Sequence, residues 1–193
     1  TGAIAEAAGK PAAAGATALP FATPTEPVVV YEADGLRVTA FPVDHRPVQP
    51  AVGYRFDYKG RSVVLSGDTA PSKMVERVAK GADLLVHEAL QPEMIKLIAA
   101  QLKASGRPQT GQIMHDILDY HASPAQAADS AKVAGVRMLV LSHIVPPYPS
   151  RYLDAAFLGD AKRRYPGPIV VGEDGDFYSL PAGSTAITRG NWF

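Results

Sequence analysis

The sequence predicts an α/β fold in which antiparallel strands come first and helices alternate with buried strands afterwards. Two β-rich pairs of segments, each interrupted by turn residues, fill most of the region between Pro27 and Pro71. Beyond Pro71, stretches with helix start and stop signals alternate with short apolar runs. With 193 residues, 47% of them hydrophobic and 20% charged, the chain is long enough for one sizeable core.

The first ordered segments form two hairpin patterns. Residues 28–32 and 36–43 flank the turn residues Asp34 and Gly35, and residues 52–58 and 61–66 flank Lys59 and Gly60. In both pairs, β-branched and aromatic side chains surround a two-residue turn, which is the pattern of a β-hairpin. Four short strands are therefore expected before the first helix.

In the second part of the chain, helices are expected at residues 72–80, 92–104, 110–120, 124–134 and 153–164. The helix at 124–134 is the best marked, because Ser123 and Gln126 form a capping box, Pro124 takes the first helical position and Gly135 stops the helix. Buried strands are expected at 82–88 and 137–142, and a closing hairpin over 168–180 is expected to turn at residues 174–175.

Residues 1–27 are rich in alanine, glycine and proline and show little apolar periodicity. This composition is typical of a linker, an excursion loop or a cut end rather than of a core element. We therefore expect residues 28–193 to form the folded part.

Composition also limits the classes of function. Basic and acidic residues both number 19, so the net charge is zero and no basic excess indicates nucleic acid or an anionic membrane as partner. The chain has no cysteine, so a metal site must use nitrogen and oxygen ligands. No apolar run approaches the roughly 20 residues of a spanning helix, and no targeting segment is visible, which leaves a cytoplasmic and an exported location both open.

Polar residues with metal or acid–base chemistry follow the predicted strands. His45, Asp68 and His143 each come just after one, and His87 and Glu88 end another. Because sites in α/β sheets form where the carboxyl ends of strands open into loops, these groups are candidates for one cleft. Imidazole and carboxylate groups held on rigid strand ends suit a divalent cation such as zinc. The alternative for Asp68 alone is a cap on the helix that follows it.

Four stretches carry a family resemblance: "VDHRPVQPAVGYRF", "VVLSGDT", "LLVHEAL" and "YHASPAQAADSAKVAGVRMLVLSHI". Over about residues 28–171 the sequence resembles the metallo-β-lactamase superfamily, in its ribonuclease Z and arylsulfatase-like branch. The resemblance implies the carboxyl-terminal half of an αββα sandwich with two metals, usually Zn²⁺. It also implies that His45 and His143 are metal ligands, that Asp68 bridges the metals, and that Glu88 and His121 help to protonate the leaving group.

The sequence departs from that family in two ways. The H-x-H-x-D-H motif, which supplies ligands from the amino-terminal half, has no match, since the five histidines stand at positions 45, 87, 115, 121 and 143. We therefore expect a separate amino-terminal half, as another chain or as upstream sequence, to complete the site. After His143 the chain reads "HIVPPYPS", as in arylsulfatase-like members, where ribonuclease Z has residues suited to tRNA phosphates. Together with the zero net charge, this ranks a small anionic ester, arylsulfatase-like or phosphodiesterase-like, above tRNA as the substrate.

Other interpretations stay open at this stage. The chain could be a tRNA 3′-processing endoribonuclease, or a non-catalytic module that binds a partner, although the three retained ligands argue against the latter. His87 is either a partner of the site or a packed core histidine, and Tyr54 either lines the pocket or points outward. Thr69 is a candidate for contact with the substrate or with a ligand, and His115 is expected to be structural or at the surface. The sequence leaves a homo-oligomer open.

Overall fold

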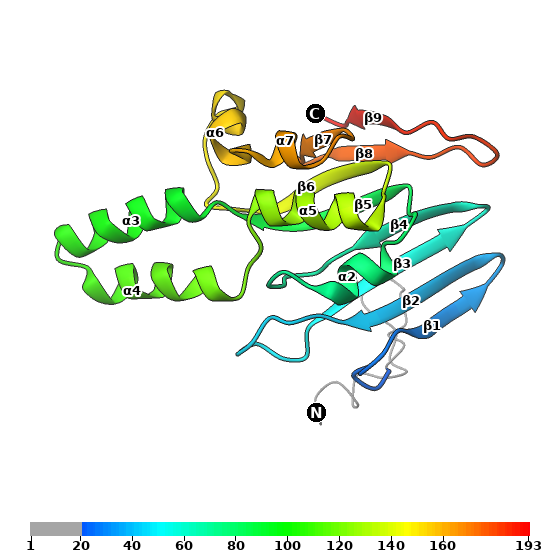
Figure 1. The fold of residues 1–193 in the computed structure, drawn as a ribbon, viewed down its shortest axis with the longest axis horizontal. Coiled ribbons are helices and arrows are strands. Elements are labelled where there is room, and N and C mark those ends of the chain that lie inside the picture. The colour runs from blue at the N-terminus through cyan, green and yellow to red at the C-terminus, as the bar shows by residue number, and fades with distance from the viewer. Residues whose placement is uncertain (1–20) are drawn as a thin grey trace.

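The computed structural model describes residues 21–193, so most of the segment expected to be a linker lies outside the described residues. Seven strands form one sheet in the order β1 to β7, and β8 and β9 form a second, antiparallel sheet (Figure 1). The strands are β1 (Val28–Ala33), β2 (Leu36–Pro42), β3 (Val52–Tyr58), β4 (Arg61–Leu65), β5 (Leu84–Leu90), β6 (Met138–Val145), β7 (Ile169–Val171), β8 (Asp176–Ser179) and β9 (Thr188–Asn191). Strands β1 to β4 pair antiparallel and β4 to β7 pair parallel, which confirms the predicted mixed α/β class.

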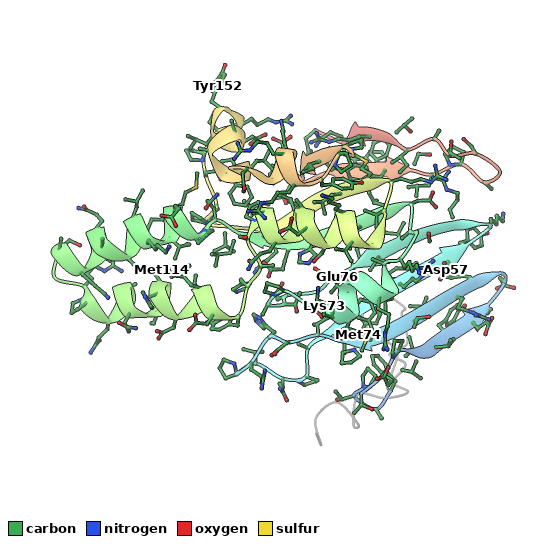
Figure 2. All side chains as sticks on the ribbon, in the orientation of Figure 1. Asp57, Lys73, Met74, Glu76, Met114 and Tyr152 are labelled. Atoms are coloured by element: carbon green, nitrogen blue, oxygen red, sulfur yellow. The ribbon has the colours of Figure 1, made fainter. Side chains whose placement is uncertain are left out.

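The helices lie mainly over one face of the large sheet. They are α2 (Lys73–Val78), α3 (Pro92–Ala104), α4 (Pro108–Asp116), α5 (Pro124–Ala134), α6 (Asp154–Leu158) and α7 (Ala161–Arg164), with 3₁₀ turns η1 (Ile117–Asp119) and η2 (Arg151–Leu153). Helices α3 and α4 form a hairpin that projects from the body of the molecule (Figure 1). Tyr152 of η2 also projects into solvent (Figure 2). None of the helices within residues 21–193 combines the length and apolar character that a membrane crossing requires.

The hydrophobic core lies between the sheet and these helices. Leu85 of β5, Leu139 and Leu141 of β6 and Phe157 of α6 are completely buried in it, and Val64 contributes from β4. Because side chains alternate along a strand, the neighbours of these core residues point to the opposite face of the sheet. That face is only partly covered in the described chain.

On the opposite face, Val63, Leu65 and Val86 remain partly exposed. A pocket of about 430 Å³ opens there beside Phe56 and Val63. The second sheet and the loop between its two strands lie near this face and are fixed by Arg61, whose guanidinium donates to the loop carbonyls of Pro181, Ser184 and Ala186. Around β4, β5 and β6, the sheet therefore has one packed face and one that is partly open among the described residues.

The helix signals were accurate where a cap was present. Ser123 and Gln126 make both hydrogen bonds of a capping box, and Gly135 ends α5 in the left-handed conformation. Helix α2 is capped by Ser72, whose hydroxyl accepts from the Val75 backbone N–H. Asp68 is therefore not the N-cap of this helix, which excludes the capping role considered for it from the sequence.

Two element predictions were wrong, and a third was shifted. The helix expected at 110–120 is present but begins at Pro108, since proline takes its first turn, and its end is the 3₁₀ turn η1 rather than α-helix. The helix expected at 153–164 is divided into α6 and α7 by Gly159, which has a φ of +54°. The expected closing hairpin does not form, since β7 pairs with β6 and β8 pairs with β9.

Candidate functional site

Four side chains from the ends of strands or the loops directly after them, and a fifth from the segment between η1 and α5, gather at one edge of the sheet. We call His45, Asp68, Glu88, His121 and His143 the strand-end cluster. The His143 Nε2 atom lies 3.6 Å from the Asp68 Oδ2 atom, and both side chains are about half exposed. The His121 ring lies between two others, 4.9 Å from the His45 ring and 5.8 Å from the His143 ring.

Asp68 reaches this edge because of a turn directly after β4. Gly67 has a φ of +64°, and a Cβ atom there would lie 2.5 Å from the Val52 carbonyl oxygen. Only glycine fits a backbone that is both left-handed and this close to the neighbouring strand. The turn directs the chain away from β4 and presents Asp68 at the open edge.

His143 is presented by a β-bulge. Strand β6 was expected to end before His143, but it continues to Val145. Glu88 pairs with Ser142 and Ala89 pairs with Ile144, so His143 is left out of the ladder between them. Its φ of +46° is unusual for a residue with a side chain.

Behind the exposed pair, Glu88 and His121 form a buried pair. The Glu88 side chain is 2% exposed, the His121 side chain is 8% exposed, and Glu88 Oε2 lies 3.2 Å from His121 Nδ1. The two atoms are close but are not aligned as a hydrogen bond, so each is buried without a hydrogen-bond partner among the described residues. The other carboxylate oxygen, Oε1, accepts from the Ala122 N–H at 2.7 Å and from the Thr69 N–H at 3.4 Å.

Backbone and side-chain hydrogen bonds hold the three loops of the cluster together. His45 donates from Nδ1 to the Tyr120 carbonyl at 3.0 Å, because a carbonyl can only accept, and within the part of the chain that the structure describes its Nε2 atom remains free for another partner. The Thr69 hydroxyl, which is fully buried, accepts from the Asp44 N–H at 3.2 Å. Thr69 therefore ties the loop of Asp68 to the loop of His45, and Glu88 ties the loop of Asp68 to that of His121.

The remaining sequence candidates lie outside the strand-end cluster. Tyr54 is on β3 with its ring against Phe21 and Phe56. His87 is completely buried under the helices and donates from Nδ1 to the Glu88 carbonyl at 2.7 Å. His115 is exposed on α4, as expected.

Sequence reasoning missed Ser66. Its side chain is buried, and its hydroxyl accepts from the Glu88 N–H at 3.1 Å. The sequence did contain a signal for this role. Ser66 stands at the carboxyl end of the apolar run "SVVLSG", and a hydroxyl buried there needs a hydrogen-bond partner.

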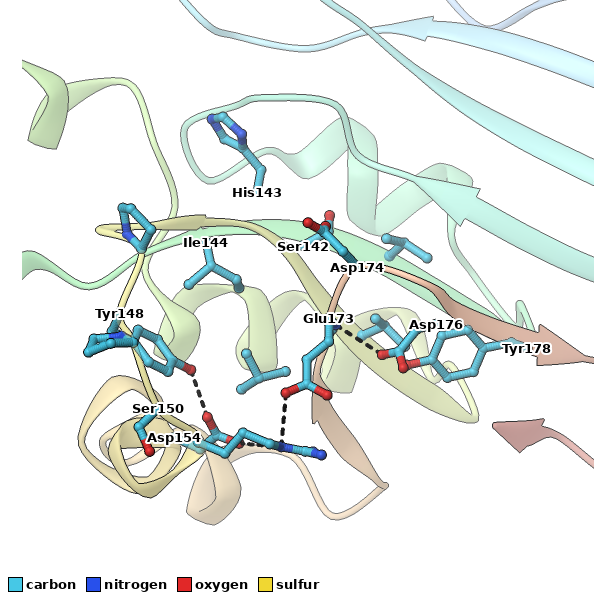
Figure 3. A pocket seen from close by; sticks show the side chains of 17 residues that line it. Ser142, His143, Ile144, Tyr148, Ser150, Asp154, Glu173, Asp174, Asp176 and Tyr178 are labelled. Atoms are coloured by element: carbon cyan, nitrogen blue, oxygen red, sulfur yellow. Dashed lines mark hydrogen bonds and ion pairs between the residues drawn. The ribbon is translucent and has the colours of Figure 1, made fainter. Parts of the chain in front are cut away.

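Sequence reasoning also missed a pocket of about 670 Å³ beside His143 (Figure 3). Its wall carries the carboxylates Asp154, Glu173, Asp174 and Asp176. Arg151 lies between two of them, 3.2 Å from Glu173 and 3.9 Å from Asp154. Burial, together with a hydrogen bond to Asp154 at 2.9 Å, raises the pKa of Tyr148 above its ordinary value.

The donor atoms of the strand-end cluster fit a divalent metal in type but do not complete a site. Imidazole nitrogen and carboxylate oxygen are ordinary zinc ligands, and a site usually takes four. Within residues 21–193, no three histidine, aspartate or glutamate side chains are arranged so that they could hold a metal ion. The described residues thus offer part of a ligand set, with Asp68 and His143 the nearest to sharing one ion.

Comparison with known proteins identifies the family. The sequence pattern of the beta-lactamase superfamily domain matches residues 5–144. In structure, the chain is similar to the metallo-beta-lactamase fold protein YhfI from Bacillus subtilis, with a TM-score of 0.53, 18% identity, and coverage of 86% of this chain and 54% of that one. The chain therefore belongs to the metallo-β-lactamase superfamily, and the fold expected from the resemblance is confirmed.

Within that superfamily, the sequence is similar to ribonuclease Z proteins. It is 39% identical over 145 residues to ribonuclease Z of Mycobacterium avium, covering 75% of this chain and 48% of that protein. It is 38% identical over 145 residues to a putative ribonuclease Z of Mycobacterium tuberculosis, covering 75% and 59%. The chain thus spans about half the length of the curated relatives it matches. Membership of the superfamily implies dependence on a divalent metal, generally zinc.

Proposed function

We propose that this chain contributes half of the active site of a metal-dependent hydrolase that cleaves phosphodiester bonds. The observation that carries the proposal is the strand-end cluster. It has a half-exposed pair of ligand-type side chains, Asp68 and His143, with a buried carboxylate–imidazole pair, Glu88 and His121, directly behind it. An exposed metal-binding edge and a buried proton donor are the two parts that ester hydrolysis at a metal needs.

His45 and His143 would each be a ligand of one of two metal ions, and Asp68, 3.6 Å from His143, would be a further ligand. His45 is oriented for this by its Nδ1 hydrogen bond to Tyr120, which leaves Nε2 as the free ligand atom. A divalent cation bound there would lower the pKa of its bound water and polarise the ester oxygen. The fixed turn at Gly67 and the bulge at His143 keep two of these ligands on rigid backbone.

Glu88 and His121 would supply a proton to the leaving oxygen. Burial of Glu88 among backbone N–H donors fixes one of its oxygens and leaves the other 3.2 Å from His121. A carboxylate at that position would orient the imidazole ring toward the reacting ester. His121 would then donate its proton as the bond to the leaving group breaks.

We further propose that residues outside this sequence complete the ligand set. Two observations support this: the described residues offer fewer than three ligands of one ion, and the curated relatives are about twice as long. The missing ligands would come from a segment equivalent to the other half of those relatives. Below, the assembled protein means this chain together with such a segment, for which the non-overlapping part of the Mycobacterium avium relative is a convenient source.

Two substrate classes are candidates. The names of the relatives favour RNA, and the precursor of a tRNA is the substrate to test first. A small anionic ester is favoured by the zero net charge of the chain, which offers no basic excess for neutralising a polyanionic backbone. Parallel assays of a tRNA precursor with a 3′ extension and of an aryl phosphodiester separate the two.

The Asp68→Ala variant tests the proposed metal site. In the assembled protein we expect it to lower the zinc content and to abolish hydrolysis of an aryl phosphodiester, because a carboxylate ligand of the metal is removed. Zinc per protein is measured by elemental analysis after dialysis. Asp57→Ala is the matched control. Asp57 pairs with Arg55 near the carboxyl end of β3 (Figure 2), whereas the turn that presents Asp68 lies beside Val52 at the start of that strand. Full zinc occupancy in Asp68→Ala would exclude the ligand role.

A further inference from the structure

His87 is a buried polar residue that the proposed chemistry does not use. Its side chain is completely buried, and the ring makes one hydrogen bond within the described residues, from Nδ1 to the Glu88 carbonyl at 2.7 Å. Within residues 21–193, the Nε2 atom is buried without a hydrogen-bond partner. A core histidine that served only for packing would be replaceable by an apolar side chain, so this arrangement needs a reason.

The hydrogen bond fixes the protonation of the ring. A carbonyl oxygen can only accept, so Nδ1 must carry the hydrogen, and the neutral ring leaves Nε2 bare. Burial lowers the pKa of His87 and keeps the ring in this neutral form. The ring therefore acts as a fixed donor aimed at one main-chain oxygen.

That oxygen belongs to the residue at which the β5 ladder becomes irregular. On one side, pairing of β4 with β5 ends at Leu65 and Val86, and the Ser66 hydroxyl takes the Glu88 N–H. On the other side, the bulge at His143 interrupts the pairing of β5 with β6 directly after Glu88. The two main-chain polar groups of Glu88 are thus held by side chains, the N–H by Ser66 and the carbonyl by His87.

We propose that His87 is a positioning residue, whose Nδ1–H donor holds the backbone of Glu88 so that its carboxylate faces His121 across the bulge. The inference rests on the proposed function, because it assigns His87 a role in the acid step of that reaction. The geometric consequence is direct: the Glu88 carboxylate must reach the N–H groups of Ala122 and Thr69 and the His121 ring at once. A rotation of the Glu88 peptide would break this set of contacts.

The test compares His87→Asn with His87→Leu in the assembled, zinc-loaded protein. Asparagine and leucine have nearly the same shape and leave the same cavity, but only the asparagine amide can place a donor where Nδ1 was. The rate is measured for aryl phosphodiesters with good and poor leaving groups, together with the thermal unfolding midpoint and the zinc content. We expect His87→Leu to lose about 10- to 100-fold in rate on the poor leaving group, the range for partners that orient a catalytic group.

We expect three further results. The loss in His87→Leu is smaller on the good leaving group, zinc content stays at the wild-type level, and His87→Asn recovers most of the rate. Equal losses in a folded His87→Leu and His87→Asn, or an equal loss on both leaving groups, would overturn the positioning role. Wild-type protein that hydrolyses none of these esters would instead count against the proposed function.

Nitrogen-15 NMR of the wild-type imidazole provides a second measurement if His87→Leu does not fold. The inference expects a ring with hydrogen on Nδ1 and none on Nε2. A ring with the hydrogen on Nε2 cannot donate to Glu88, and that result would overturn the proposal without any variant.

Discussion

At the residue scale, the candidate site is made by backbone irregularities as much as by its side chains. His143 has a left-handed backbone within a bulge, and such a conformation in a residue with a side chain costs about 1 to 3 kcal/mol. Gly67 makes the equivalent turn for Asp68 with no Cβ to strain. The gathering of His45, Asp68, Glu88 and His143 could be anticipated from the sequence because strand ends meet at one edge, whereas His121 was expected only from the family resemblance. The bulge and the hydroxyl of Ser66 could not be anticipated, because they depend on how two ladders end.

His121→Ala tests the acid role at this scale. We expect the assembled protein to keep its zinc and to lose about 10²- to 10⁴-fold in rate on esters with poor leaving groups, the usual contribution of a general acid. A leaving phenolate that is already stable needs little protonation, so the loss on such an ester should be much smaller. A plot of rate against leaving-group pKa, compared with wild type, gives the answer. The same loss for every leaving group would mean that His121 is not the acid.

The stability of the protein should depend on pH through His87. Burial lowers the pKa of His87 in the native state below its ordinary value of 6.5. Below pH 6.5, the unfolded chain therefore binds a proton at His87 more readily than the native state does. The contribution of neutral His87 to the free energy of unfolding is therefore fully present above pH 6.5 and is lost as the pH falls below that value. Thermal unfolding midpoints measured at about pH 7.5 and about pH 5.5 should differ less in His87→Asn than in wild type. His115→Asn, exposed on α4, should keep the wild-type difference.

At the element scale, elements defined by local signals could be predicted from the sequence, whereas strand pairs between distant segments could not. The two hairpins and α5 were predicted well because turn residues and caps act within a few positions. The supposed closing hairpin failed because β7 finds its partner in β6, and nothing near Asp174 in the sequence reveals that pairing. Gly159 was overlooked for a different reason, since one glycine inside a helical pattern is often tolerated.

Arg61 joins elements that sequence patterns leave unconnected, and its removal is a test of that connection. The ion pair of Arg61 with Asp83 is buried, at 3.1 Å, and Arg61 also holds the loop before β9. We expect Arg61→Met to destabilise the assembled protein by about 3 kcal/mol, because the loop carbonyls lose their donor and the buried Asp83 carboxylate keeps only the half-exposed Arg137 as its cation. Urea unfolding measures the change. Arg37→Met, which removes the exposed pair with Glu32, should leave the midpoint unchanged.

At the scale of the whole molecule, the sheet has a packed face and an open one. Helices α2, α5, α6 and α7 supply the partners of the core strands, whereas Val63, Leu65 and Val86 on the other face stay partly exposed. A second layer over that face would bury apolar surface at about 25 cal/mol per Å². Membership of the family could be predicted from motifs alone, but which residues of the open face are covered depends on a partner layer and not on any local pattern.

The final prediction concerns assembly. We expect residues 1–193 alone to bind zinc weakly, to associate through the open face and to show no ester hydrolysis, because large exposed apolar areas are not tolerated in isolation. Adding the non-overlapping part of the Mycobacterium avium relative should restore zinc binding, give a defined complex in analytical ultracentrifugation and produce activity. Val63→Asp on the open face should weaken the complex while leaving Asp68 and His143 intact, and Asp57→Asn should leave assembly unchanged as the control. A well-folded monomer of residues 1–193 with tightly bound zinc and full activity would contradict both the incomplete ligand set and the role of the open face.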